Sequence, residues 1–176
     1  MKRFITSACA ALLPGLILIS SAQAHDGTVY ISGKIKDMTC AVSPDSKNFT
    51  VDLGSVTSKQ FNNVGDGSEY RPFVIKLENC GPVVDSLTVH FDGTPDSKNA
   101  DLLAITSDTA SAAGVGIAIY NQDKSIIPLG DESVKFPLTP DQASATLNFY
   151  ARYIANGDAI VAGTANASAT FILTYA

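Results

Sequence analysis

Few side chains in this 176-residue chain have the types and spacing that catalysis or metal binding needs. The two histidines, His25 and His90, do not form a His-x-Glu pattern, and there is no Cys-x-x-Cys pair that would suit zinc. A Gly-x-Ser-x-Gly elbow and a glycine-rich phosphate loop are also missing from the sequence. A loose acidic region does not match the spacing of a calcium loop and favours a solvated loop: Asp92, Asp96, Asp101 and Asp108. The chain is therefore predicted not to be an enzyme and to need no cofactor or metal.

Residues 1–24 have the features of a secretory signal peptide. The basic pair Lys2-Arg3 precedes a largely apolar stretch over residues 4–19, and the small-x-small sequence Ala-Gln-Ala at 22–24 suits signal peptidase. Pro and Gly at 14 and 15 interrupt the apolar stretch, which is shorter than the ~20 residues of a membrane span. An uncleaved membrane anchor is the disfavoured alternative. The mature chain is expected to begin at His25.

The cysteines agree with an exported protein. Cys9 lies in the predicted signal peptide, so the mature chain keeps one pair, Cys40 and Cys80. In an oxidising compartment such a pair is expected to form a disulfide, and two free thiols are the weaker alternative. Closing a loop of this length would restrict the unfolded chain by roughly 4 kcal/mol.

The residues after the signal peptide alternate between apolar and polar in short runs, separated by turn residues. This pattern predicts a single all-β domain, a sandwich or a barrel. The stretch 99–113 lacks a helical stripe and is predicted to be a loop. Four runs are expected to turn one apolar face inward: Phe73, Ile75 and Leu77; Leu87, Val89 and Phe91; Val115, Ile117 and Ile119; Leu147, Phe149, Ala151 and Tyr153.

Charge excludes some partners of this domain. Removal of residues 1–24, which hold two of the 12 basic residues and none of the 17 acidic ones, changes the net charge from −5 to −7. Because this acidic sequence has no basic stripe, nucleic acid is not an expected partner. No small-molecule substrate is expected either.

Both ends of the mature chain are regularly patterned. The first end, before Cys40, alternates with one apolar face at Val29, Ile31, Gly33 and Ile35. Pattern alone favours an ordinary first strand, but such a segment could also leave its domain and complete a neighbour by β-strand addition. The second end carries one face to the penultimate residue: Gly163, Ala165, Ala167, Ala169, Phe171, Leu173 and Tyr175. Since chain ends usually fray, this regularity indicates a strand that is used.

In the order and spacing of several motifs, the chain resembles the pilins of chaperone–usher pili over essentially its whole length. The matching features are Gly33 in an alternating extension, Cys40 and Cys80, Asp52-Leu53-Gly54, Gly114-Val115-Gly116-Ile117, Pro128-Leu129, the run 148–153, Gly163 fourteenth from the end and the penultimate Tyr175. Within the family, the runs 48–53 and 59–63 most resemble the minor tip-fibre adaptor subunits of type 1 fimbriae.

The resemblance implies an incomplete immunoglobulin-like β-sandwich that lacks its final strand. Residues 25–37 would be a donor-strand extension, with Val29, Ile31, Gly33 and Ile35 pointing into a neighbour's groove, and residues 38–176 the pilin domain. The acceptor groove would be lined partly by the Gly163–Tyr175 face. The carboxylate of Ala176 would be anchored in the cleft of a periplasmic chaperone, and the disulfide would join the first strand to the second.

The implied function is a structural subunit of an adhesive fimbria. Such a subunit is exported through the periplasm to the fimbrium on the bacterial cell surface, polymerises by donor-strand exchange with neighbouring subunits, and needs a chaperone and an outer-membrane usher. The donor segment disfavours a terminator, and the length disfavours a two-domain adhesin. A tip adaptor is preferred, and the alternatives are a major rod pilin or a self-contained secreted immunoglobulin-like binding module.

Overall fold

The computed structural model describes residues 29–33, 39–82, 85–140 and 142–176. The chain divides into an N-terminal unit that ends at Lys34 and a second unit that begins at Ile35. In the first unit, residues 29–33 are exposed and form no regular element. Ile35, the fourth predicted donor residue, and the predicted signal peptide lie outside the described residues.

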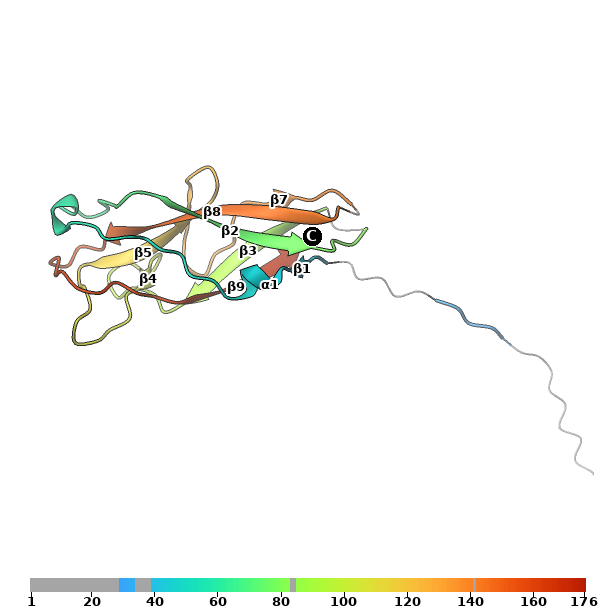
Figure 1. Ribbon diagram of the computed structural model, residues 1–176, viewed down its shortest axis with the longest axis horizontal. Helices are drawn as coiled ribbons and strands as arrows, with labels where there is room; N and C mark the ends of the chain where they lie inside the picture. The colour runs from blue at the N-terminus through green and yellow to red at the C-terminus, as the bar shows by residue number, and fades with distance from the viewer. Residues whose placement is uncertain (1–28, 34–38, 83–84, 141) are drawn as a thin grey trace, which may run out of the picture. The chain divides into compact units, whose positions relative to one another are not determined.

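The second unit is almost entirely β and forms two sheets (Figure 1). The first sheet has the order β1-β2-β8-β5-β4, with β6 also paired to β5, and the second has the order β7-β3-β9. All the strand pairs are antiparallel. The elements are β1 (Ala41–Val42), α1 (Pro44–Lys47), the 3₁₀ turn η1 (Ser58–Gln60), β2 (Arg71–Glu78), β3 (Ser86–Gly93), β4 (Leu103–Ala104), β5 (Val115–Tyr120), β6 (Ile126–Ile127), β7 (Phe136–Pro137), β8 (Ser144–Ala155) and β9 (Ala169–Tyr175).

The core lies between the sheets and uses the alternating residues that the sequence indicated. Phe149 of β8 is fully buried at its centre, and its ring packs within 5.2–5.5 Å of Phe73, Phe91 and Phe136. Ile75, Leu77, Leu87, Val89 and Leu147 are buried around it. The prediction of an all-β sandwich is confirmed, and the inward faces of β2, β3 and β8 are those predicted.

The core consists of two clusters of buried residues, and a separate, smaller apolar cluster lies on the outer side of the first sheet. Ala118 and Tyr120 of β5 and Ile154 of β8 pack there with Leu102, which follows the loop after β3. The stretch 99–113 is therefore a loop as predicted, apart from the two-residue strand β4, and its Leu102 covers β5. In the described ranges, no helix is long and apolar enough to cross a membrane.

Candidate functional site: an open strand edge

Strand β9 leaves one long edge without a strand partner in the part of the chain that the structure describes. It pairs with β3 from Leu87↔Tyr175 to Gly93↔Ala169 and stands at the end of its sheet. The inward side chains of β3 are at most 4 % exposed, whereas the β9 residues opposite them are only half-buried: Phe171, Leu173 and Tyr175. If β9 had a neighbouring strand on each side, its core face would be fully buried. The contrast therefore indicates room for one more strand beside β9.

A second uncovered backbone runs through residues 49–56. Within the described residues this segment makes no backbone–backbone hydrogen bond and forms no helix or strand, and it has apolar side chains at alternate positions. Leu53 is buried, Val51 is half-buried and Phe49 is 41 % exposed. The ring of Phe49 lies 6.0 Å from that of Phe73, which packs on the same core as Phe171 and Leu173.

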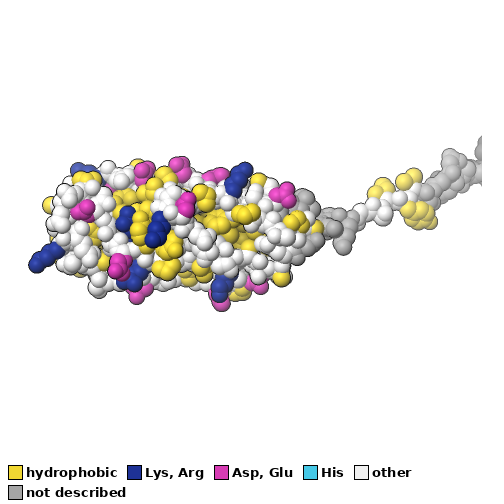
Figure 2. All heavy atoms as spheres, turned by 90° about the horizontal axis from the view of Figure 1, so that it is seen from above, with side chains coloured by type: hydrophobic (Ala, Val, Ile, Leu, Met, Phe, Trp, Pro, Cys, Tyr) yellow, Lys and Arg dark blue, Asp and Glu magenta, His cyan; other side chains and the backbone are white. Residues whose placement is uncertain are grey.

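These two segments are the free edges of one incomplete core. Both have backbone N–H and C=O groups without a backbone partner in the described residues. Phe171 and Leu173 pack on one core cluster and Val51 on another, and Phe73 packs against both clusters. A hollow of about 320 Å³ lies where residues 45–52 meet β2. Edges of this kind can take up an extended segment through a hydrogen-bond ladder and alternate side-chain contacts. Figure 2 shows one face of this unit, on which hydrophobic side chains lie among charged and other ones.

The segment before β9 does not continue the pairing with β3 but begins against residues 110–112. Residues 163–168 precede the strand, and the Thr164 backbone bonds to both Ala110 and Ala112 at 2.8 and 2.7 Å. A Cβ on Gly163 would lie only 2.4 Å from the carbonyl oxygen of Ala110. Glycine is therefore required there by close backbone packing, and the chain then crosses to the second sheet as β9.

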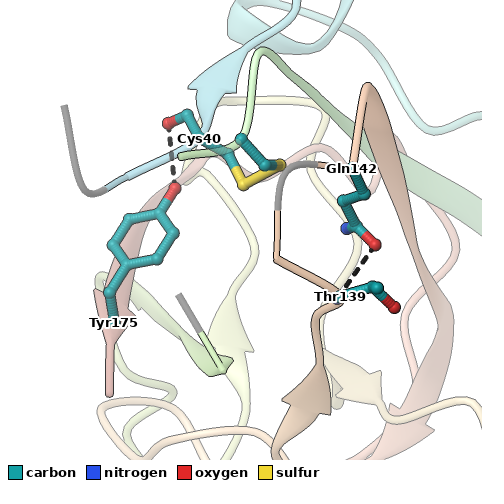
Figure 3. The surroundings of a disulfide bond; sticks show 5 residues. Cys40, Thr139, Gln142 and Tyr175 are labelled. Atoms are coloured by element: carbon teal, nitrogen blue, oxygen red, sulfur yellow. Dashed lines mark hydrogen bonds between the residues drawn. A yellow bond between two sulfur atoms is a disulfide. The ribbon is translucent and has the colours of Figure 1, made fainter. Parts of the chain in front are cut away.

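The C-terminal end of β9 is attached to the start of the domain (Figure 3). The hydroxyl of Tyr175 donates a hydrogen bond to the backbone carbonyl of Cys40 at 3.0 Å. Cys40 is bonded to Cys80, which confirms the predicted disulfide between the chain before β1 and the chain after β2. The N–H of Ala176 donates to Ser86 at 3.0 Å, so the backbone is held to its last residue while Ala176 stays exposed.

Two tyrosines beside the open core have phenol pKa values raised above the ordinary value of about 10. Burial raises the pKa of Tyr175. Burial, and then the negative charge of Asp52, raises the pKa of Tyr153, whose hydroxyl donates to the carbonyl of Ala165 at 2.9 Å. Both phenols therefore act as hydrogen-bond donors over the physiological pH range.

The structure thus brings together the second half of the predicted groove face and separates the first half from it. Ala169, Phe171, Leu173 and Tyr175 lie on β9, whereas Gly163 packs on residues 110–112. Ala165 and Ala167 are half-buried against the two core clusters. The sequence prediction overlooked residues 49–56, although the alternation of Phe49, Val51 and Leu53 was a signal for it. Across the described ranges, no group of three His, Cys, Asp or Glu residues could hold a metal ion.

Comparisons with known proteins agree with an incomplete sandwich. Residues 29–176 match the family described as Fimbrial protein. A fimbrial-like protein of Escherichia coli K12, YcbV, is 40 % identical over 86 % of this chain and 87 % of its own length. A probable major fimbrial subunit, LpfA of E. coli O157:H7, is 34 % identical over 99 % and 97 %.

Solved structures show the same fold. The type I fimbria protein BPSL1626 of Burkholderia pseudomallei has a TM-score of 0.60 and 33 % identity, over 79 % of this chain and 90 % of its own. A subunit from the structure of a chaperone–usher pilus has a TM-score of 0.64 and 23 % identity, over 89 % and 99 %.

The fold and its open edge define the class of immunoglobulin-like pilins that lack their last strand. The chain belongs to the fimbrial protein family. It is therefore a structural subunit of chaperone–usher fimbriae rather than an enzyme, it polymerises with neighbouring pilus subunits, and it is exported to the fimbrium on the cell surface.

Proposed function

We propose that this chain is an internal link of its fibre, which accepts a donor strand beside β9 and donates its own residues 25–37 to another subunit. The observation that carries this proposal is the half-covered inward face of β9. The donor side is supported by Val29 and Ile31, which are 84 % and 93 % exposed and leave their apolar side chains available.

The energetics suit exchange between subunits. Each of Val29, Ile31 and Ile35 would contribute roughly 1.5–3 kcal/mol on burial, and a backbone ladder along β9 would add to that. Gly33 would allow close approach where the groove is shallow. In the periplasm, a chaperone would cover the edge and anchor the exposed C-terminal carboxylate of Ala176, and an outer-membrane usher would replace it with the next subunit.

A pair of matched variants tests the donor segment. Ile31→Asp places a charge on the proposed inward face, whereas Ser32→Asp places the same charge on the opposite face. We expect polymers that resist detergent to disappear in Ile31→Asp and to persist in Ser32→Asp, as seen on gels of unheated fimbriae. Deletion of residues 25–37 should prevent entry into a preceding subunit.

Two outcomes would contradict the proposal that the chain is an internal link of its fibre. A truncated chain that still assembled into fibres would refute the donor segment. A stable monomer when the chain is expressed alone would indicate a self-contained binding module.

We further propose the position of a minor tip adaptor, which contributes to cell adhesion, on the resemblance of residues 48–53 and 59–63. The second candidate is a major rod pilin, which is supported by the similarity to LpfA over 99 % of the chain. The two positions differ in copy number, so immunogold labelling of isolated fimbriae separates them. Label confined to the tip supports the adaptor, and label along the fibre supports the rod.

A further inference from the structure

The outer face of the first sheet carries a cluster of aromatic rings and cations that takes no part in the open edge. This Tyr70 cluster consists of Tyr70, Tyr120, Tyr150, Lys124 and Arg152. Tyr120 of β5 stands opposite Tyr150 of β8 in the register, and the ring centroid of Tyr70 lies 5.0 Å and 5.9 Å from theirs. Tyr150 and Arg152 alternate along β8 with residues that are buried in the core, so the cluster lies on the face turned away from it.

Both cations of the cluster rest on aromatic rings. The guanidinium carbon of Arg152 lies 4.2 Å from the ring centroid of Tyr70, and its Nε donates to the Tyr120 hydroxyl at 3.0 Å. The Nζ of Lys124 lies 4.9 Å from the centroid of Tyr70 and 5.8 Å from that of Tyr150. Cation–π contacts of this kind hold the two positive charges in place on the sheet.

The turn that carries Lys124 is built around an uncommon backbone conformation. Lys124 has a φ of 66°, in the left-handed region where asparagine or glycine is the usual residue. Its N–H donates to the carbonyl of Asn121 at 3.0 Å, and the N–H of Asn121 donates to the carbonyl of Ser125 at 2.9 Å. The neighbouring carboxylate of Asp123 accepts from the N–H and the hydroxyl of Ser125 at 2.9 and 2.6 Å. The turn therefore directs a lysine to the rings and keeps its acidic neighbour on Ser125.

The two cations keep donors available for a ligand. Neither Lys124 nor Arg152 belongs to an ion pair in the part of the chain that the structure describes. In the same ranges the Arg152 side chain makes one hydrogen bond, from Nε, which leaves its two terminal nitrogens for other acceptors. Lys124 is exposed and Arg152 is half-buried, so both reach solvent.

The position in the sheet limits what the cluster can recognise. Strand β8 is paired with β2 on one flank and with β5 on the other, so the middle of the sheet offers a peptide no free edge to extend. Recognition must therefore come from side chains. Tyr70 and Tyr150 are half-buried, so part of each ring remains open, and the negative face of such a ring attracts C–H groups. The phenol hydroxyls add hydrogen-bonding groups, and the cations suit a carboxylate.

We propose that the Tyr70 cluster binds an acidic saccharide, in which a sugar unit carries one carboxylate. Lys124 and Arg152 bind the carboxylate, and the tyrosine rings pack against the apolar face of the sugar ring. A chain of net charge −5 repels a polyanion as a whole, whereas a single carboxylate meets the local cations. The cluster uses neither the β9 edge nor the N-terminal segment, so this binding is independent of strand exchange.

Photo-cross-linking to isolated fimbriae tests the binding at any copy number of this chain. The probe is a galacturonate tetrasaccharide with a photoreactive group, and its methyl ester is the matched neutral control. Mass spectrometry locates the label, which we expect on the peptides that contain Tyr150 or Lys124 and only with the acidic probe. Competition by free galacturonate or by N-acetylneuraminate gives an apparent affinity for each and shows whether the natural ligand is of the hexuronate or the sialic acid type.

Variants connect the label to the two cations. Lys124→Gln or Arg152→Gln should weaken the apparent affinity by about tenfold, the effect of losing one hydrogen bond between charged groups. Lys124→Arg should retain binding, and Lys59→Gln, at an exposed lysine of η1, should leave it unchanged. Detergent-resistant polymers should persist in every variant, which distinguishes lost binding from failed assembly. If Arg152→Gln does not reach the fibre, the exposed Lys124 decides the test.

Three results would overturn the saccharide site. They are labelling that is no stronger with the acidic probe than with its methyl ester, an apparent affinity that Lys124→Gln leaves unchanged, and equal competition by a polyglutamate peptide, which would show that charge alone attracts the probe.

Discussion

Substitution of Gly163 by alanine separates two explanations for the same glycine. The sequence pattern placed Gly163 on the face that lines the groove, whereas the structure packs it on residues 110–112. The added Cβ would lie 2.4 Å from the Ala110 carbonyl oxygen, 2.5 Å from the Ser111 carbonyl carbon and 2.6 Å from the Ala112 nitrogen. All three are backbone atoms, so no side-chain rotation relieves the clash.

The expected cost follows from the contacts that must separate. Two backbone hydrogen bonds, Thr164 to Ala110 and Ala112 to Thr164, hold this junction. At about 0.5–1.5 kcal/mol each, their loss would lower the free energy of unfolding by about 2 kcal/mol. With a guanidinium dependence of roughly 4 kcal/mol per molar, the unfolding midpoint should fall by about 0.5 M.

Tyrosine fluorescence measures this midpoint, since the chain has six tyrosines and no tryptophan. Purified fimbriae of Gly163→Ala would be unfolded beside the wild type and the exposed neighbour variant Ala162→Ser, which should match the wild type. If the variant fails to reach the fibre, protease resistance of the exported chain in cell extracts reports its folding. A normal midpoint, or a protease-resistant subunit that merely fails to polymerise, would refute the packing explanation.

Three further predictions concern stability. Replacing Cys40 and Cys80 together by serine removes a cross-link between residues 40 apart and should cost about 4 kcal/mol, seen as a lower denaturant midpoint that matches the reduced wild type. Phe149→Ala should lower the free energy of unfolding by about 3–5 kcal/mol, because the fully buried ring packs against three other rings. A variant with the same denaturant midpoint as the wild type would contradict this, because it would show that the core can collapse around the gap. The pKa values of Tyr153 and Tyr175 are raised in the fold, so their contribution to stability is complete below pH ~10 and is lost as the pH rises above that. The double variant Tyr153→Phe with Tyr175→Phe should therefore flatten the fall of the denaturant midpoint above about pH 10, and an unchanged slope would contradict this prediction.

Local alternation was enough to predict the strands that form the core. Apolar residues two positions apart lie on the same face of a pleated strand. The structure buries two such pairs as this alternation predicts: Ile75 and Leu77 on β2, and Leu87 and Val89 on β3. The disulfide was predictable because the exported chain keeps one cysteine pair. The role of Gly163 was not, because the clash involves the backbone of Ala110, which is distant in sequence. The contact between Arg152 and the ring of Tyr70 was equally hidden, since the two residues meet just beyond the Arg71↔Ala151 end of the β2–β8 pairing.

The disulfide also determines how this subunit would respond to mechanical tension. If residues 25–37 are held by another subunit as proposed, a pulling force enters the domain just before Cys40 and passes through a covalent bond to the end of β2. Strand β2 is aligned with β8 over eight residue pairs, so the load is shared in shear across the ladder instead of opening it one bond at a time. The short strand β1, with two residues, carries little of that force. Under that proposal, the covalent bond would let a weakly paired first strand serve as the attachment point between subunits.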